Sequence, residues 1–454
     1  MPTSNKPLRI VADRNIPLVE KAFAPFGEVA ALPTTSITPE SARRADALIV
    51  RSETKVTAAL LDGSPVTFVG SASIGTDHVD LDELADRGIA FANAPGCNSD
   101  SVKEYIFAAL LHLAGERSFL LRGKTLGIVG VGSVGRKVAA AAAGLGMAVL
   151  LNDPPRARDE GAAGFLPLDD LMAADIVTLH VPLTRSGEDA TYQLFDAGRL
   201  ARMKPGAVLI NASRGAVVPT SALKRALAGG HLAAAILDVW DNEPDVDLEL
   251  LSRTALGTAH IAGYSMEGKL NAVRLVREAF CRHFGLDAPS GDEPSARHSP
   301  VDVGQGQVRR EWVPGQSPGP LPTRPLKTAW STRPLKTAWS SQTSQTSQTP
   351  QTPWDPFQEI PAPEITDIRV APDPLPPEDI LRKVVTACYD IRVDDELLRR
   401  AAALPAEKRP DYFRGLRAEY RVRREFSNVT VHLPRAHEGL GKSLAALGFR
   451  FKIQ

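Results

Sequence analysis

Three polar side chains that each follow a short apolar run could together carry out acid–base chemistry on a hydroxy acid. Arg214 follows the run 207–213, Glu243 follows the run 233–240, and His260 lies in the segment TAHIAGY. Because imidazole titrates near neutral pH, His260 could accept a hydroxyl proton while hydride leaves the neighbouring carbon. Glu243 would orient that ring and favour its charged form, and Arg214 offers a planar fork for a carboxylate and polarises the reacting oxygen. We therefore predict these three residues as the catalytic set of an oxidoreductase.

A glycine-rich segment, GVGSVG at 130–135, indicates where a dinucleotide would bind. It follows the apolar run 126–129 and opens a stretch of helical periodicity. The first glycine permits a tight turn, the second lets the backbone approach a pyrophosphate, and the third lets the helix pack closely on the strand. The start of that helix also favours the negative charge of the phosphates. The predicted cofactor contacts are Gly130, Gly132, Ser133, Val134 and Gly135.

An acidic residue at the end of the next apolar run indicates which dinucleotide is used. Asp153 stands 18 residues after Gly135, where a carboxylate accepts hydrogen bonds from the adenosine ribose and repels a 2′-phosphate. NAD is therefore the expected cofactor, although Arg156 and Arg158 keep NADP open. The alternative is that Asp153 is only a solvated turn residue before two prolines. A second acid, Asp238, ends another apolar run, and we expect it near the nicotinamide carboxamide.

The elements that must position these residues follow from the apolar runs. Continuous Val, Ile and Leu runs predict strands buried on both faces, as in a parallel sheet, and the helical stretches between them predict a doubly wound α/β fold. Such sheets bind ligands at the carboxyl ends of their strands, where the residues above lie. His78 and His180 are interpreted as structural. Strands are expected at 8–13, 45–51, 66–73, 125–132, 147–153, 175–182, 207–213 and 233–240, and helices at 101–117, 135–145 and 220–228.

Composition excludes several classes of protein. The 454-residue chain balances 53 basic against 53 acidic residues, which argues against a dedicated nucleic-acid binder. The first residues lack the pattern of a signal peptide, and the most apolar stretch is too short to span a bilayer. The three cysteines lie far apart, as in a reduced protein without a disulfide or zinc framework. We therefore expect a cytoplasmic enzyme with no metal and with neither a membrane nor a nucleic acid as partner.

The α/β pattern ends near residue 289, where proline-rich, low-complexity sequence begins. TRPLKTAWS occurs twice in succession and is followed by three SQT triplets, and such sequence cannot bury a core of its own. We predict a disordered linker over 289–360. After it, helical patterns over 380–390 and 412–425 and a strand over 428–433 predict a small α+β domain at 361–454.

The glycine segment and the Arg, Glu, His set resemble the D-2-hydroxyacid dehydrogenase family, and the resemblance covers residues 7–285. It implies a Rossmann-type NAD domain at 99–263. It also implies a flavodoxin-like substrate domain that is split between 1–98 and 264–288. Ordinary members of the family lack a tail like the one at 361–454.

Further segments resemble one branch of this family more closely than the rest. That branch carries a C-terminal dimerisation domain, and it oxidises 4-phospho-D-erythronate to 2-oxo-3-hydroxy-4-phosphobutanoate with NAD in vitamin B6 biosynthesis. The resemblance therefore implies a small phosphorylated hydroxy-acid substrate and a homodimer. The segments are VRSETKV at 50–56, GTDHVD at 75–80, APGCN at 94–98, PAPEI at 361–365 and CYDIRVDD at 388–395.

The same resemblance assigns roles to single residues. Ser73 stands where the branch has Thr, so it keeps the hydroxyl and loses a methyl group. Val181 also replaces the usual Thr, so any contact there must run through the backbone. The implied substrate contacts are Ser52, Ser73 and Tyr264, and the implied NAD contacts are Asp153, Val181, Asp238 and Gly263.

A phosphate on the substrate requires cations, and two parts of the chain supply them. Arg51 adjoins Ser52, and the tail carries seven basic residues against two acids between Lys408 and Arg424. The plainer interpretation of that run is a solvated helix face. The sharper hypothesis is that Arg423 reaches the active site of a partner subunit and binds the phosphate there.

The sequence leaves other functions open. Another phospho-2-hydroxyacid dehydrogenase, such as one that acts on 3-phosphoglycerate, would share the catalytic set, but the tail argues against it. A non-catalytic, NAD-sensing binding protein would use the proline-rich segment for interaction, and the intact catalytic set disfavours it.

Overall fold

A five-stranded parallel sheet forms the N-terminal part of the computed structural model, which describes residues 7–287, 363–372 and 374–454. The predicted linker at 289–360 lies outside the described residues. The strand order, β2-β1-β3-β4-β5, is that of flavodoxin-like sheets. Sequence analysis missed β2 and β5 because both are edge strands whose side chains are partly exposed, so neither forms a continuous apolar run. The strands are β1 (Leu8–Asp13), β2 (Gly27–Leu32), β3 (Ala47–Val50), β4 (Phe68–Ser71) and β5 (Ala90–Ala92).

A second parallel sheet has six strands in the order β11-β10-β9-β8-β6-β7. β7 and β8 pair with opposite sides of β6, so the winding of the chain reverses at β6. In doubly wound sheets this reversal opens the ligand-binding crevice at the carboxyl ends of the strands. The predicted α/β doubly wound fold is confirmed. The strands are β6 (Thr125–Val129), β7 (Ala148–Asn152), β8 (Ile176–Leu179), β9 (Ala207–Asn211), β10 (Leu232–Leu237) and β11 (Leu256–Gly257).

Two long helices connect the sheets. α5 (Ser99–Glu116) has 14 of its 18 residues buried, so it is covered on all sides rather than on one face. α11 (Met266–Phe284) returns to the first sheet, where the Phe280 ring packs 5.2 Å from that of Phe23 and 5.7 Å from that of Phe68. Ser265 caps α11 by accepting a hydrogen bond from the Gly268 amide, and Gly285 ends it with a positive φ of 64°. A segment far along the chain thereby completes the N-terminal layer.

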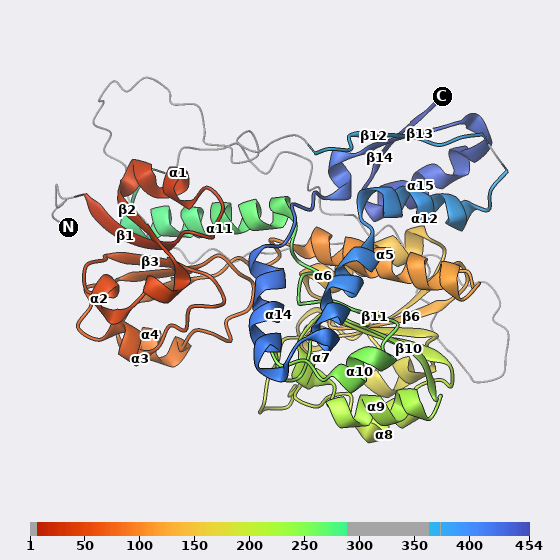
Figure 1. Cartoon of the computed structure of the whole chain (residues 1–454), viewed down its shortest axis with the longest axis horizontal. Coiled ribbons are helices and arrows are strands. Elements are labelled where there is room, and N and C mark those ends of the chain that lie inside the picture. Colours follow the sequence, from red (N-terminus) through yellow and green to blue (C-terminus); the bar gives the residue numbers. More distant parts are fainter. Residues whose placement is uncertain (1–6, 288–362, 373) are drawn as a thin grey trace.

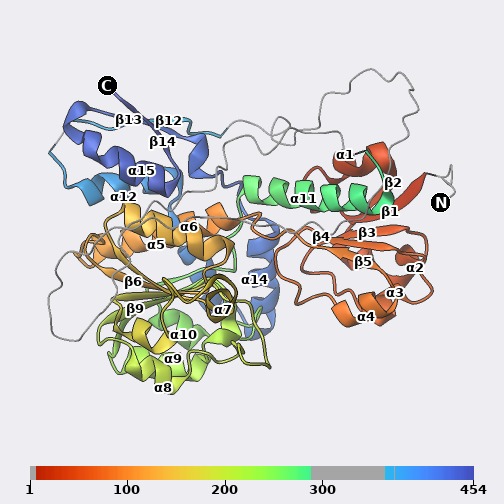
Figure 2. The same ribbon diagram turned by 180° about the vertical axis from the view of Figure 1, so that it is seen from behind.

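The remaining helices are short and surround the two sheets (Figures 1 and 2). Within the described part of the chain, no helix is both long and apolar enough to cross a membrane. The helices are α1 (Val19–Phe23), α2 (Pro39–Ala42), α3 (Ala58–Leu61), α4 (Leu81–Asp86), α6 (Ser133–Gly144), α7 (Pro154–Glu160), α8 (Ala197–Arg202), α9 (Thr220–Ala228) and α10 (Leu248–Arg253).

The tail combines a three-stranded parallel sheet with four α-helices. The predicted helix over 412–425 is wrong beyond residue 418, because the next residues pair with other elements. The Arg423 carbonyl accepts a hydrogen bond from the Met266 amide, and the Phe426 amide donates to Glu104. The elements are β12 (Asp367–Arg369), β13 (Thr430–Leu433) and β14 (Arg450–Ile453), with α12 (Pro377–Cys388), α13 (Ile391–Arg399), α14 (Arg409–Ala418) and α15 (Gly441–Leu447).

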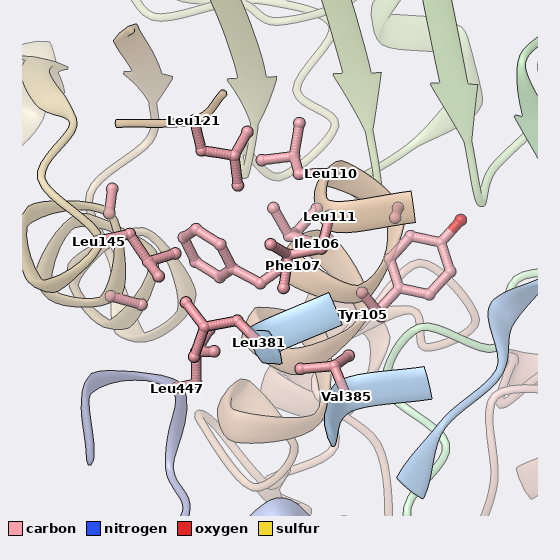
Figure 3. Close-up of a cluster of buried hydrophobic side chains, with 14 of the residues drawn as sticks. Tyr105, Ile106, Phe107, Leu110, Leu111, Leu121, Leu145, Leu381, Val385 and Leu447 are labelled. Carbon is pink, nitrogen blue, oxygen red and sulfur yellow. The ribbon is translucent and has the colours of Figure 1, made fainter. Parts of the chain in front are cut away.

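The tail docks on the second sheet's helices through an apolar core. Figure 3 shows Phe107 of α5 pointing toward Leu145, next to α6, and toward Leu381 of α12. Leu447 of α15 joins the same cluster, and all four side chains are at most 3% exposed. α14 does not join this layer. It lies between the N-terminal sheet and the second sheet, as both views show (Figures 1 and 2).

Buried acids also hold the tail. The Glu425 carboxylate, 5% exposed, accepts hydrogen bonds of 2.9 Å from the hydroxyls of Ser101 and Ser265. Burial, together with the negative charges of Asp100 and Glu267, raises the pKa of Glu425 to about 7. This carboxyl group therefore couples the docking of the tail to pH.

The contribution of Glu425 to stability should fall as pH rises through this range. Unfolded, Glu425 releases its proton near the ordinary value of 4.5, whereas the folded protein keeps that proton up to about pH 7. Folding therefore binds a proton between these values. The stabilisation is complete below pH 4.5 and is lost as pH rises to about 7, a change on the order of 3 kcal/mol. The difference in the urea unfolding free energy between wild type and Glu425→Gln, taken at both ends of this range, measures this contribution.

Glu425→Gln should remove this contribution, because the amide stays neutral at every pH. His78 and His180, whose pKa values burial lowers, contribute the opposite slope in both proteins. Glu419→Gln, an exposed substitution in the same segment, is the matched control and should leave the wild-type slope unchanged. Equal slopes in wild type and Glu425→Gln would show that another group titrates instead.

Candidate active site

The glycine segment forms the turn between β6 and α6. Gly130 has a positive φ of 87°, and a side chain there would meet the His180 carbonyl oxygen at 2.5 Å. A side chain at Gly135 would collide with the Gly130 carbonyl. Above Gly132, by contrast, no atom lies within 4 Å of where a β-carbon would stand. Gly132 is also the N-cap of α6 and no side chain caps the helix, so its first amides face open space, as a pyrophosphate requires.

Asp153 lies at the end of β7, directly beside this turn. Its carboxylate accepts hydrogen bonds from the Val131 amide at 2.8 Å and from the Arg156 amide at 3.1 Å. The guanidinium of Arg156 pairs with Glu160 and also donates a hydrogen bond to the Val131 carbonyl of the turn, whereas that of Arg158 pairs with Asp189. Asp153 and Arg156 therefore both lie at the turn, and the contact of Asp153 with a ribose stays a prediction.

Asp153→Asn should weaken the preference for NAD. The substitution keeps an oxygen that can cap α7, but it removes the charge that repels a 2′-phosphate and that strengthens hydrogen bonds to the ribose. We expect the ratio of kcat/KM for NAD to that for NADP to fall by about 10–100-fold. Steady-state kinetics with both cofactors measure this ratio. Asp159→Asn, an exposed change on the same helix, serves as the control, and an unchanged ratio in Asp153→Asn would contradict the assignment.

His260 and Glu243 form a hydrogen-bonded pair. Glu243 Oε2 lies 2.7 Å from His260 Nδ1, and its other oxygen accepts a hydrogen bond from the Trp240 amide. Burial alone would raise the pKa of Glu243, but the charge of His260 and these hydrogen bonds lower it below its ordinary value. Because Nδ1 is bound to a carboxylate, Nε2 is left to exchange a proton with a substrate. His260 also has a φ of 56°, a left-handed conformation that non-glycine residues seldom adopt away from functional sites.

Asp238 holds the His260 loop in that conformation. Its carboxylate is 1% exposed and accepts hydrogen bonds from Thr258 Oγ1 and from the amides of Ile261 and Ala262. The Asp238 carbonyl accepts a further bond of 2.7 Å from the His260 amide. The structure thus gives Asp238 a positioning role that sequence analysis did not predict. Its contact with the nicotinamide stays a prediction.

Arg214 reaches across to the N-terminal part of the chain. Its guanidinium donates two hydrogen bonds to the same oxygen of Asp77, at 2.9 and 3.1 Å, and one to the Ser213 carbonyl. A side chain at Gly75 would collide with this guanidinium, so the glycine makes the approach possible. Asp77 was missed from the sequence, because 137 residues separate it from Arg214. The carboxylate that Arg214 binds in this structure is thus one of the protein's own.

Three of the predicted substrate contacts, Arg51, Ser52 and Ser73, lie on the loops that follow β3 and β4, whereas Tyr264 lies just before α11. Ser73 Oγ bonds to Ser71 Oγ at 2.8 Å, and Ser71 Oγ contacts His78 Nε2 at 2.9 Å. Burial lowers the pKa of His78 to about 4, in agreement with a structural role. Ser52 is exposed, and the neighbouring Arg51 forms an ion pair of 3.0 Å with Glu53.

Burial also keeps His180 in its neutral form. It lowers the pKa of His180 to about 3, and the His180 ring bonds to Thr178. Its carbonyl faces Gly130, and Val181, which follows it, contacts the glycine turn with a methyl group. Gly263 lies against the Asn98 side chain, which leaves no room for a larger residue there.

Comparison with known proteins identifies the family. The family model for the D-isomer specific 2-hydroxyacid dehydrogenase NAD binding domain matches residues 103–262. The erythronate-4-phosphate dehydrogenase of Chromohalobacter salexigens is 40% identical over 451 residues, which cover 98% of this chain and 99% of that protein. The chain belongs to the erythronate-4-phosphate dehydrogenase family. The enzyme of that name from Salinibacter ruber is 41% identical and covers 95% of this chain and 96% of its own length.

Solved structures support the fold of the core without the tail. A D-lactate dehydrogenase from Aquifex aeolicus, complexed with NAD and lactic acid, superposes with a TM-score of 0.52 at 25% identity. It covers 61% of this chain and 96% of its own. The tail matches instead a domain of unknown function over residues 360–448. The similarity to the erythronate-4-phosphate dehydrogenases, in contrast, extends through the tail. The sequence had suggested this combination of a dehydrogenase core with a C-terminal domain.

The structure contradicts the role that was predicted for one site residue, Arg423. Arg423 does not reach outward to a partner subunit, because it is 4% exposed and donates hydrogen bonds to the carbonyls of Ser101 and Ala262 of its own chain. Its guanidinium also stacks 4.4 Å from the Tyr389 ring. Arg423 therefore anchors the tail.

A different tail residue lies at the site. Arg417 of α14 donates a hydrogen bond of 3.1 Å to the Tyr264 hydroxyl, and its charge helps to lower the pKa of Glu243. Sequence analysis counted Arg417 only as part of a basic run. The basic stretch between residues 408 and 424 was the only hint in the sequence, and it does not show which of its arginines faces Tyr264.

Proposed function

We propose that this chain catalyses the NAD-dependent oxidation of 4-phospho-D-erythronate to 2-oxo-3-hydroxy-4-phosphobutanoate, a step of pyridoxal 5′-phosphate biosynthesis. The observation that carries the proposal is the pair of Glu243 and His260, 2.7 Å apart and aimed by a left-handed backbone, on the strand edge that holds the glycine turn. Membership of the erythronate-4-phosphate dehydrogenase family over nearly the whole chain supports the choice of substrate.

The arrangement explains how the reaction proceeds. His260 Nε2 accepts the proton of the C2 hydroxyl, and Glu243 stabilises the imidazolium that forms. Arg214 leaves Asp77 and binds the substrate carboxylate with its planar fork, next to the oxygen on which the ketone develops. NAD, when bound, supplies the acceptor for the hydride that leaves C2. The open space above Gly132 and the uncapped start of α6 are suited to its pyrophosphate.

The proposal extends to the domains and to assembly. We assign 99–263 to NAD binding, 1–98 with 264–288 to substrate binding, and 361–454 to a dimerisation domain of a homodimer. The packing of α11 on the first sheet supports the split substrate domain. The three cysteines are free thiols, which supports the reducing environment of the cytoplasm.

We propose the following residue roles. Arg214, Glu243 and His260 are catalytic, and Arg51, Ser52, Ser73 and Tyr264 contact the substrate. The NAD contacts are Gly130, Gly132, Ser133, Val134, Gly135, Asp153, Val181, Asp238 and Gly263.

A substrate panel tests the function. Purified full-length protein is incubated with NAD and, in separate reactions, 4-phospho-D-erythronate, 3-phospho-D-glycerate and D-lactate, and NADH formation is followed. We expect the highest kcat/KM for 4-phospho-D-erythronate. A higher value for 3-phospho-D-glycerate would assign the chain to the other phospho-hydroxyacid reaction, and no NADH with any acid would point to a binding protein.

A further inference from the structure

Two cations from different parts of the chain flank the ring of Tyr264. Lys269 Nζ, from α11, lies 4.9 Å from the ring centroid. The Arg417 guanidinium, from α14, lies 5.8 Å from the same centroid and donates a hydrogen bond to the hydroxyl. Arg51, at the end of β3, is close enough for its charge to act on Lys269. Two positive charges from distant segments therefore lie at one tyrosine, and a third, Arg51, lies near one of them.

Two of these three charges, Lys269 and Arg417, form no ion pair with a carboxylate among the described residues. Among the described residues, no carboxylate forms an ion pair with Lys269, and burial followed by the charge of Arg51 lowers its pKa. Arg417 Nε is buried without a hydrogen-bond acceptor. Glu53 forms an ion pair with Arg51, and the negative charges of Glu243 and Glu53 also act on Arg417 without an ion-pair contact. An unpaired buried donor next to like charges is destabilising, so the cluster is suited to an anion that brings several acceptor oxygens.

The position of the Tyr264 cluster relative to the catalytic residues indicates which anion binds there. Tyr264 follows His260 by four residues, and the charge of Arg417 acts on Glu243, so the cluster adjoins the base. The carboxylate end of a substrate is already accounted for by Arg214, whose partner in this structure is Asp77. A four-carbon acid phosphate carries its second anionic group at the opposite end from its carboxylate. The Tyr264 cluster supplies cations for that end.

We propose that Lys269 and Arg417, with Arg51, bind the phosphate group of the substrate around Tyr264. This inference rests on the proposed function and extends it, because it gives the tail a part in substrate selection within its own chain. α14 lies between the two sheets (Figure 1), so docking of the tail brings Arg417 to the site. Arg417 contacts the phosphate through a planar fork and Lys269 acts as a compact charge.

Variants of the two cations test the proposal with two substrates. In Lys269→Gln and Arg417→Gln, we expect KM for 4-phospho-D-erythronate to rise by about 10–100-fold, because each variant loses a charge-assisted hydrogen bond. The kcat/KM for D-erythronate, which has no phosphate, should fall by a much smaller factor than that for the 4-phosphate. Inorganic phosphate should inhibit D-erythronate oxidation competitively in the wild type and should lose this effect in both variants.

The controls separate this role from others. Arg274→Gln on α11 and Arg414→Gln on α14 remove exposed cations that pair with neighbours on the same helix, and both should behave as wild type. Equal losses of kcat/KM for D-erythronate and its 4-phosphate would overturn the proposal, because they would make Arg417 a positioning residue of Glu243. An unchanged KM in both variants would overturn it as well.

Failure of the proposed function gives a different result. If the wild-type protein oxidises neither acid, that function is wrong. Calorimetric titration with inorganic phosphate then decides whether the cluster binds phosphate: weaker binding in both variants supports the site, and binding equal to that of the wild type rejects it.

Discussion

Replacing His260 with asparagine should lower kcat for 4-phospho-D-erythronate by about 10²–10⁴-fold, the usual contribution of a general base. Asparagine is chosen because it tolerates the left-handed conformation that His260 adopts, with a φ of 56°. The loop bonded to Asp238 should therefore persist, and only the proton acceptor is lost. Steady-state NADH formation measures kcat, and the Kd for NAD, determined by calorimetry, should stay close to that of the wild type.

The control for this experiment is His283→Asn. His283 is exposed near the end of α11, where it bonds to Thr67 and packs against the rings of Phe68 and Phe284, so kcat should not change. A His260→Asn enzyme that retains more than about a tenth of the wild-type kcat would mean that another group accepts the proton.

The catalytic loop was predictable from the sequence because its signals are local. The glycine turn needs three glycines within six residues, and Gly130 and Gly135 each occupy a position where a side chain would meet backbone atoms. His260 and Glu243 each follow a strand of one parallel sheet, and that topology alone brings strand ends to one edge. The fold class followed in the same way from apolar runs. These inferences required no knowledge of contacts between distant segments.

The residues that sequence analysis missed or misplaced depend on such contacts. Asp77 bonds to Arg214, which lies 137 residues away in the sequence, and the residues around neither one predict this pair. Arg417 and Arg423 belong to one basic run, yet one faces Tyr264 while the other is buried against Tyr389. The predicted helix over 412–425 could not separate them, because the chain leaves the helix after residue 418 and extends toward α11.

Phe107→Ala should destabilise the protein by about 3–5 kcal/mol. Phe107 is fully buried, and its ring points between α6 and the tail helix α12 (Figure 3), so truncation leaves a cavity where the tail meets the second sheet's helices. Urea unfolding, compared with wild type, measures the loss. Leu120→Ala is the control, because Leu120 is 58% exposed and its truncation should cost less than about 0.5 kcal/mol. A loss of under about 1 kcal/mol for Phe107→Ala would mean that the core closes around the cavity.

This destabilisation should have a functional consequence that distinguishes the tail from the rest of the chain. The cavity weakens the contact of α5 with α12 and α15, and the chain that continues from α12 carries Arg417 to Tyr264. In urea below the unfolding midpoint, Phe107→Ala should therefore lose affinity for 4-phospho-D-erythronate before it loses affinity for NAD, whose glycine turn is formed by β6 and α6. Hydrogen exchange should show α14 opening over the same range. If both affinities fall together, the second sheet and the tail unfold as one unit, and the tail is as much a part of the NAD-binding core as it is of the substrate site.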